Sequence, residues 1–233
     1  MIISAYSGDK KTILSPLYGR FKTLIKRMVS VITFLVFLLQ SAYAQDPVRI
    51  LVLGDSLSSG YGLPVGNSFP ELLQQALTND GLSVTIENAG VAGDTTTGGA
   101  ARLDWALASK PDAVIIELGA NDALRAIDPA ITRQNLDMIL AELDRLTLPA
   151  LLTGMKAPPN LGMTYGREFE IIYPDLAEKY QVVFYPFFLE GVAAQPHFNQ
   201  PDGIHPNRRG VEVVVERILP YVKKLIEKTG HNP

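Results

Sequence analysis

Residues 50–64 read ILVLGDSLSSGYGLP, and this stretch decides the fold class. Its aliphatic residues are followed at once by Gly54, Asp55 and Ser56. A short, continuous aliphatic run that ends in turn residues is typical of a strand buried on both faces. The serine therefore stands where a buried strand ends. In a parallel sheet, this is the edge at which ligands bind.

Four further aliphatic runs follow the same pattern. With residues 49–54 they predict five buried strands, the others at residues 83–88, 112–119, 149–154 and 181–186. Amphipathic stretches separate the runs: Ser68 and Glu71 form a capping box that predicts a helix start, and the last helix is expected over residues 206–228. Regular strand–helix alternation implies right-handed crossovers and helices on both faces. The predicted fold is therefore a three-layer α/β/α domain with a parallel sheet.

The first 44 residues differ in character from the rest. Basic side chains precede the apolar run of residues 28–40, and Ala42-Tyr43-Ala44 has the small-x-small pattern of a cleavage site. We predict a secretory signal peptide, residues 1–44, that is cut after Ala44, and one folded domain over residues 45–233. The apolar run is short for a membrane span, and an uncleaved anchor is the alternative. The basic extension leaves both Met1 and Met28 open as the natural start.

Charge and composition exclude several functions. The first 44 residues hold six of the 21 basic and one of the 24 acidic side chains, so the remainder carries a formal charge of −8. This acidic balance argues against nucleic acid as a partner. The chain has no cysteine and three histidines, which excludes a cysteine nucleophile and disfavours a histidine-rich metal site. We expect a reaction that requires no metal and no cofactor.

Ser56, His205 and Asp202 are the candidate catalytic residues. A serine hydroxyl becomes a good nucleophile when a base takes its proton, and an imidazole that titrates near neutrality suits that task. Asp202 lies three residues before His205, so its carboxylate can hold the ring tautomer that points the second nitrogen at Ser56. The oxyanion of acyl transfer needs donors, which we expect from the backbone N–H groups of Ser56 and Gly93 and the side-chain amide of Asn121.

Each of these residues also has a purely structural interpretation. Ser56 can cap a helix, Asn121 can belong to a turn, and residues 202–206 can form a turn that opens the last helix. The functional interpretation is favoured because these side chains follow predicted strands and therefore meet at one edge of the sheet. His197 has no carboxylate one turn away, and His231 is close to the C-terminus, so we expect both to be surface residues.

The G-x-S-x-G elbow of α/β-hydrolases does not fit, because Ser58 stands where the second glycine is required. Instead, the chain resembles the GDSL, or SGNH, hydrolase family. The four blocks of that family appear in order as GDSLS at 54–58, GD at 93–94, GAND at 119–122 and DGIHP at 202–206. Further segments, among them ELGANDALR and IYPDLAEKY, are similar to the bacterial periplasmic branch that includes acyl-CoA thioesterase I, lysophospholipase L1 and arylesterase.

This resemblance implies a flavodoxin-like sheet of five parallel strands and a serine hydrolase that cleaves esters and thioesters of fatty acids through an acyl-serine intermediate. It implies Ser56 as the nucleophile, Asp202 and His205 as its partners, and Gly93 and Asn121 as oxyanion donors. We expect a periplasmic or secreted monomer that acts on a small acyl ester or thioester and contacts lipid transiently. The alternatives are a carbohydrate-deacetylating esterase of the same superfamily and a non-catalytic lipid-binding protein. A nucleotide-binding domain is disfavoured, since no G-x-G-x-x-G follows the first strand.

An apolar substrate groove is expected beside Ser56. Its predicted lining consists of Leu57, Leu161, Met163 and Phe188. These side chains could instead belong to the hydrophobic core, and for Phe188 the core is the favoured interpretation. Residues 154–166 are expected to form a loop that acts as a partly mobile lid.

Overall fold

The computed structural model describes residues 20–30, 32 and 46–230 of the 233-residue chain. The chain divides into two compact units, Met1–Gln45 and Asp46–Pro233. Residues 20–30 and 32 of the first unit are helical, with exposed side chains. Most of the apolar run of residues 28–40, and the predicted cleavage site after Ala44, lie outside the described residues. Within the described ranges, no helix combines the length and the apolar character that crossing a bilayer requires.

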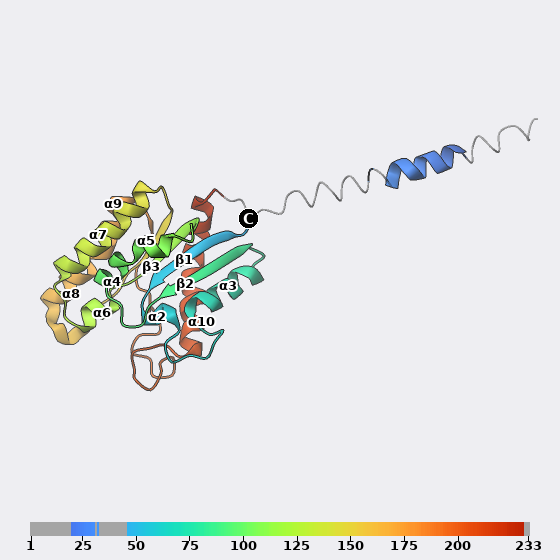
Figure 1. Ribbon diagram of the computed structural model, residues 1–233. Coiled ribbons are helices and arrows are strands. Elements are labelled where there is room, and N and C mark those ends of the chain that lie inside the picture. The colour runs from blue at the N-terminus through green and yellow to red at the C-terminus, as the bar shows by residue number, and fades with distance from the viewer. Residues whose placement is uncertain (1–19, 31, 33–45, 231–233) are drawn as a thin grey trace, which may run out of the picture. The chain divides into compact units, whose positions relative to one another are not determined.

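Five strands form one parallel sheet in the second unit (Figure 1). They are β1 (Val48–Gly54), β2 (Val84–Gly90), β3 (Ala113–Glu117), β4 (Ala150–Thr153) and β5 (Val183–Tyr185), in the spatial order β2-β1-β3-β4-β5. Each strand overlaps a run from which the sequence predicted it. Every residue of β3 and β4 is buried, as expected for a parallel sheet that is covered on both faces.

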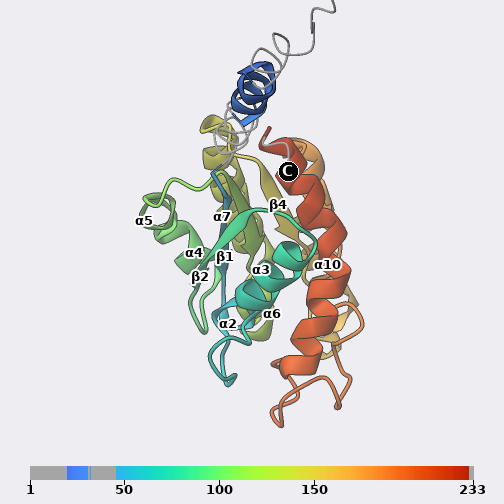
Figure 2. The ribbon, with the colours of Figure 1, turned by 90° about the vertical axis from the view of Figure 1, so that its right-hand side faces the viewer.

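Helices cover both faces of the sheet (Figure 2). Helices α3 (Phe69–Asn79) and α10 (Arg208–Lys228) pack against each other on one face. The opposite face is covered by α4 (Thr96–Ala101), α5 (Leu103–Leu107), α7 (Pro129–Arg145) and α9 (Ile172–Tyr180). The predicted three-layer α/β/α architecture is therefore confirmed.

Local sequence signals explain where two of these helices lie. Helix α3 starts at the predicted capping box, where the Glu71 carboxylate accepts hydrogen bonds from Ser68 N at 2.9 Å and Ser68 Oγ at 2.6 Å. Helix α7 presents an apolar stripe to the sheet, formed by the buried side chains of Leu136, Ile139, Leu140 and Leu143. Burial of one such leucine is worth about 1.5–3 kcal/mol, so the platform beneath the loops is firmly packed.

Residues 154–166 are only partly the loop that the sequence predicts. A short 3-10 helix, η1 (Pro159–Leu161), leads directly into helix α8 (Gly162–Glu170). Tertiary contacts explain the helix: the Tyr165 hydroxyl donates to the carbonyl of Ile127 at 2.7 Å, and Phe169 is fully buried. Such contacts outweigh the low helix propensity of the two glycines in this segment.

The strand register places the loops that follow β1, β2 and β3 side by side at one edge of the sheet. Gly54, the last residue of β1, pairs with Gly90 of β2 and with Glu117 of β3. Two short helices begin close to this edge, α2 (Ser56–Ser59) after β1 and α6 (Ala120–Leu124) after β3. The residues that follow β1, β2 and β3 therefore share the carboxyl edge of the sheet, where the predicted site lies.

Candidate active site

Ser56 is the first residue of α2 and lies one residue beyond the cap of that helix. Asp55 caps α2, since its Oδ1 accepts a hydrogen bond from Leu57 N at 2.9 Å. The helix fits against the sheet because Gly90 has no side chain: a Cβ at this position would lie 2.5 Å from Ser59 N. A four-residue helix held by its cap and by a close main-chain contact gives the Ser56 hydroxyl a defined position.

His205 links Ser56 to Asp202. Its Nε2 lies 3.0 Å from Ser56 Oγ, and its Nδ1 lies 2.7 Å from Asp202 Oδ2. Asp202 Oδ1 accepts two main-chain hydrogen bonds, from Ile204 N at 2.9 Å and His205 N at 3.0 Å. The hydrogen bond with the His205 ring, helped by these main-chain donors, lowers the pKa of Asp202 to about 2. An ionised Asp202 accepts a hydrogen bond from the Nδ1–H group, which leaves Nε2 free to accept the proton of Ser56.

The loop that carries Asp202 and His205 is anchored at several points. Gln200 N donates to the carbonyl of His205 at 2.7 Å, and the Gln200 side-chain amide donates to the carbonyl of Tyr61 at 2.8 Å. The ring of Tyr61 packs against the His205 ring, with 4.6 Å between centroids and a tilt of 41°. Tyr61 comes two residues after the end of α2, so this contact couples the position of the imidazole to the serine turn. No sequence pattern had pointed to Tyr61.

The three predicted oxyanion donors lie in the segments that follow β1, β2 and β3. Within the described part of the chain, the backbone N–H groups of Ser56 and Gly93 make no hydrogen bond. Gly93 has a φ of +80°, a conformation that favours glycine, and its carbonyl accepts a hydrogen bond from Arg125 Nη2 at 2.7 Å. The Asn121 side-chain amide donates one hydrogen to Asp55 Oδ2 at 2.9 Å and retains a second. The three predicted oxyanion donors thus follow strands at the carboxyl edge of the sheet, and each has an N–H hydrogen without a partner among the described residues.

A buried carboxyl group that the sequence analysis missed lies beneath this turn. Glu117 is fully buried at the end of β3, and its Oε2 accepts from Ser58 Oγ at 2.6 Å and Asp55 N at 3.2 Å. Its Oε1 has no hydrogen-bond partner among the described residues. Burial foremost, and then the neighbouring Asp55, raises the pKa of Glu117 well above its usual range. The one available signal was an acidic residue inside an otherwise aliphatic run.

Asp55 and Glu117 divide the roles of a coupled carboxyl pair. Burial raises the pKa of Asp55 to about 6, against the opposing hydrogen bonds from Leu57 N and Asn121. Two carboxylates in contact resist ionising together. Asp55 accepts hydrogen bonds on both of its carboxylate oxygens, whereas Glu117 accepts them on Oε2 alone, so Asp55 keeps the charge and Glu117 holds the proton. Asp55 therefore serves as the acceptor that orients Asn121.

Arg102 ties the ends of β1 and β2 together. Its guanidinium forms an ion pair with Asp94 at 2.7 Å and donates to the carbonyls of Ala89 at 2.7 Å and Gly54 at 2.9 Å. Gly54 is the last residue of β1, Ala89 is the next-to-last residue of β2, and Asp94 follows Gly93 in the next loop. These hydrogen bonds hold the loop that contains Gly93 and Asp94 close to Gly54, which precedes the serine turn.

A cavity of about 410 Å³ opens beside Ser56 and His205. Its lining is mostly apolar and consists of Ser56, Leu57, Ala120, Asn121, Leu124, Met155, Lys156, Ala157, Pro158, Pro159, Phe187, Leu189, Ala193, Ile204 and His205. Of the four side chains expected to line the groove, Leu57 does so. The cavity has the size and apolar character of a small-molecule site.

The other three expected groove residues lie elsewhere. Phe188 is 1% exposed and packs edge-on against Phe69 at 5.0 Å between centroids, so it belongs to the core. Leu161 and Met163 do not line the cavity, and Met163 is 84% exposed. The cavity wall in this segment ends at Pro159, the first residue of η1, and the later residues of η1 and α8 do not line it.

The second described histidine, and the acidic residue beside Asn121, make other contacts. The ring of His197 packs against Phe198 rather than approaching Ser56, and His231 lies outside the described residues. Asp122, beside Asn121, is fully buried and accepts hydrogen bonds from Thr96 N at 2.9 Å and from Thr96 Oγ1, which is a structural contact. Among the described residues, no cluster of three or more histidine, aspartate or glutamate side chains could hold a metal ion.

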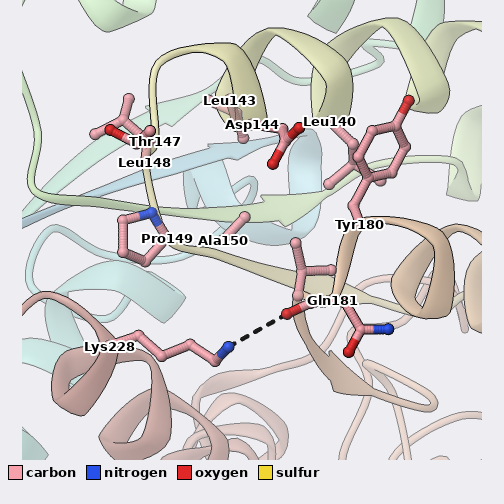
Figure 3. Close-up of a pocket in the computed structure, with 11 residues that line it drawn as sticks. Leu140, Leu143, Asp144, Thr147, Leu148, Pro149, Ala150, Tyr180, Gln181 and Lys228 are labelled. Atoms are coloured by element: carbon pink, nitrogen blue, oxygen red, sulfur yellow. Dashed lines mark hydrogen bonds between the residues drawn. The ribbon is translucent and has the colours of Figure 1, made fainter.

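A second cavity, of about 320 Å³, lies at the opposite edge of the sheet, where β4 and β5 begin (Figure 3). It is lined by Leu140, Leu143, Asp144, Thr147, Leu148, Pro149, Ala150, Tyr180, Gln181, Val182 and Lys228. Lys228 Nζ donates across it to the carbonyl of Gln181 at 3.2 Å. Neither a serine nor a histidine lines this cavity, so it is not the candidate site.

A parallel sheet that carries a serine, a histidine and an aspartate in one hydrogen-bonded chain beside an apolar cavity is typical of serine hydrolases. The chain belongs to the GDSL-like lipase/acylhydrolase family, whose model matches residues 52–213. It is a hydrolase of the esterase class.

Curated relatives and solved structures agree with this assignment. The chain is 42% identical to an arylesterase of Vibrio mimicus, over 84% of this chain and 99% of the relative. It is 37% identical to the thioesterase 1/protease 1/lysophospholipase L1 of Escherichia coli (strain K12), over 83% of this chain and 91% of the relative. Among solved structures, AlinE4, an SGNH-hydrolase family esterase, is 51% identical with a TM-score of 0.66, covering 77% of this chain and 97% of that chain.

Proposed function

We propose that this chain is a serine hydrolase that cleaves carboxylic esters and thioesters of fatty acids through an acyl-serine intermediate. The observation that carries the proposal is the chain of contacts from Ser56 Oγ to His205 Nε2 at 3.0 Å and from His205 Nδ1 to Asp202 Oδ2 at 2.7 Å. This geometry suits general-base activation of a hydroxyl nucleophile.

The reaction proceeds in two halves. In the first, His205 takes the Ser56 proton as Oγ attacks the acyl carbonyl. The C–O or C–S bond to the leaving group then breaks, and His205 donates that proton to the leaving alcohol or thiol. In the second, His205 takes a proton from water, the hydroxide attacks the acyl-serine, and Ser56 leaves with its proton restored. The N–H groups of Ser56 and Gly93 and the free hydrogen of Asn121 stabilise both oxyanions, and one such donor typically contributes about 10²–10³ in rate.

The shape of the cavity supports an acyl chain rather than a sugar. Leu57, Leu124, Met155, Phe187 and other apolar side chains surround a space of about 410 Å³ beside Ser56. Hydrocarbon leaves water favourably at such a surface, whereas a carbohydrate would need many polar partners there. This favours a medium-length acyl ester over a carbohydrate acetyl ester.

Kinetics with a graded panel of p-nitrophenyl esters and acyl-CoA thioesters tests the proposal. We expect the octanoyl ester to exceed the acetyl ester in kcat/KM and Ser56→Ala to abolish turnover of both. A fluorophosphonate probe should label wild-type protein and leave Ser56→Ala unlabelled. Wild-type protein that is folded, unlabelled and inactive would instead identify a non-catalytic lipid-binding protein. A preference for acetylated carbohydrate would identify the deacetylating esterase.

We also propose that the enzyme is exported to the periplasm or secreted, with cleavage after Ala44. The support is the basic stretch, the apolar run and the Ala42-Tyr43-Ala44 pattern. The mature enzyme would act as a monomer that meets lipid transiently. N-terminal sequencing of protein recovered outside the cytoplasm should give Gln45 as the first residue, and light scattering should give the mass of one chain. An intact leader on membrane-bound protein would contradict this proposal.

A further inference from the structure

One cationic side chain interrupts the apolar wall of the cavity. Ser56, Asn121 and His205 are the polar lining residues at the reacting end, and Lys156 is the one lysine or arginine in the described lining. All other lining side chains are apolar. The proposed reaction uses Ser56, Asn121 and His205 but assigns nothing to Lys156.

The Lys156 ammonium is held in place without an anionic partner. Its Nζ lies 4.8 Å from the centroid of the Phe187 ring, which lines the same cavity. In the described part of the chain, no carboxylate forms an ion pair with it. An aromatic face positions the charge but does not neutralise it, so the ammonium stays available to an anion.

The strand order sets the spacing of the loops that carry the nucleophile and Lys156. Ser56 follows β1 and Lys156 follows β4, and β3 lies between these two strands. Adjacent strands are about 4.8 Å apart, so the two loops start about 10 Å apart. A chain of about eight bonds spans that distance when extended, at roughly the rise per bond of an extended backbone.

Given the proposed function, we infer that Lys156 is a specificity-determining residue that binds an anionic group, a carboxylate or a phosphate, at the far end of the substrate chain in the cavity. The hydrocarbon between the ester and the anion would lie on the apolar wall. The anion would meet the ammonium at the cavity mouth, where both keep part of their hydration. The preferred substrates would therefore be esters with an apolar spacer and an anionic end.

Pairs of esters that differ only in the terminal charge test this inference. On the acyl side, p-nitrophenyl octanoate is compared with the mono-p-nitrophenyl ester of octanedioic acid. On the alcohol side, octyl acetate is compared with 8-acetoxyoctanoate and 8-acetoxyoctyl phosphate. The quantity measured is the ratio of kcat/KM for the anionic and the neutral ester, in wild type, Lys156→Met and Lys156→Arg.

We expect the ratio in at least one arm to fall by about five- to tenfold in Lys156→Met, mainly through KM, and to be largely kept in Lys156→Arg. The responding arm tells whether the acyl or the alcohol portion occupies the cavity, and which anion is bound. The preference should weaken with added salt. The butanedioic acid monoester is too short to reach Lys156, so its ratio should not respond to the substitution.

Lys224→Met is the matched control, because Lys224 also lies over an aromatic ring, 5.5 Å from the centroid of Tyr221, but does not line the cavity. Its ratios should equal those of wild type. Equal ratios in wild type and Lys156→Met in every arm would overturn the inference about Lys156 while leaving the proposed function intact. Failure of folded wild type to cleave any of these esters, neutral or anionic, would overturn both.

Discussion

The side-chain amide of Asn121 donates a hydrogen bond to Asp55 Oδ2 at 2.9 Å, which joins the residue before the serine to the loop after β3. Asp55 also caps the helix that begins at Ser56. One buried carboxylate therefore holds both the nucleophile turn and the amide that is proposed to stabilise the oxyanion. Damage to this contact should affect the chemical step more than substrate binding.

Asp55→Asn should lower kcat by about 10- to 100-fold with little change in KM, because an amide at this position no longer presents two acceptor oxygens to Leu57 N and Asn121. Steady-state kinetics with p-nitrophenyl octanoate measures both constants. Asn121→Ala should reduce kcat at least as much. The double variant should have the same kcat as the slower of the two single variants, since the two residues act as one unit. Fully additive losses would contradict this coupling.

Glu117→Gln should stabilise the protein at alkaline pH and lose that advantage at acidic pH. Burial raises the pKa of Glu117 above its unfolded value, so the folded state binds a proton that the unfolded state has released. Stability therefore falls as pH rises from the unfolded value toward the folded one, by up to about 1.4 kcal/mol per pH unit. Each kcal/mol corresponds to about 2–4 °C in Tm at this size, which calorimetry at pH 5 and pH 8 can measure. A Tm difference between the variant and wild type that does not change with pH would refute the assignment of a neutral Glu117.

Asp202→Asn should lower kcat by about 10²–10⁴, because the amide removes the acceptor for the Nδ1 proton and favours the wrong tautomer of His205. The pKa of Asp202 is lowered to about 2, so in wild type this carboxylate stays ionised above that pH and is lost only as the pH falls through it. Loss of wild-type activity between pH 7 and pH 4 should consequently come from other groups. A pH–rate profile that is limited by Asp202 in this interval would contradict the contact geometry.

Tyr61→Ala should reduce kcat by about two- to tenfold, since it removes an aromatic contact worth about 0.5–1.5 kcal/mol that holds the His205 ring. Tyr61→Phe keeps the ring and should retain nearly full activity. Both variants should unfold within a few degrees of wild type, because Tyr61 is exposed. If the phenylalanine variant is as slow as the alanine variant, the ring contact is not the cause.

Gly166→Ala should stabilise the domain by about 0.5–1 kcal/mol, because glycine inside a helix loses more backbone entropy on folding than alanine. Gly166 lies within α8, and a Cβ there would meet nothing within 4 Å. Thermal unfolding measures the gain. The same variant tests the expected lid: unchanged kcat and KM for the octanoyl ester would show that Gly166 is not a hinge.

Helix α8 and Glu117 show where prediction from the sequence reached its limit. The pattern of residues 162–170 contains two glycines and no clear apolar stripe, so the helix was invisible until its packing was known: Tyr165 stacks on Phe169 at 6.0 Å, and Phe169 meets the Tyr173 ring at 5.7 Å. In the sequence, Glu117 was an acidic residue within the strand predicted over residues 112–119. Its burial beneath Ser58 depends on a contact across 59 positions of the chain.

The sequence by itself determined the strand order along the chain, the three-layer class and the loops that carry Ser56, Gly93, Asn121, Asp202 and His205, because hydrophobic periodicity and turn residues act locally. The tertiary structure decided which side chains share one space: the pairing of Asp55 with Glu117, the ring of Tyr61 on His205, and a cavity wall that includes Lys156 and excludes Phe188. Burial and distance depend on how all elements pack at once, and a pattern of neighbouring residues does not contain that information.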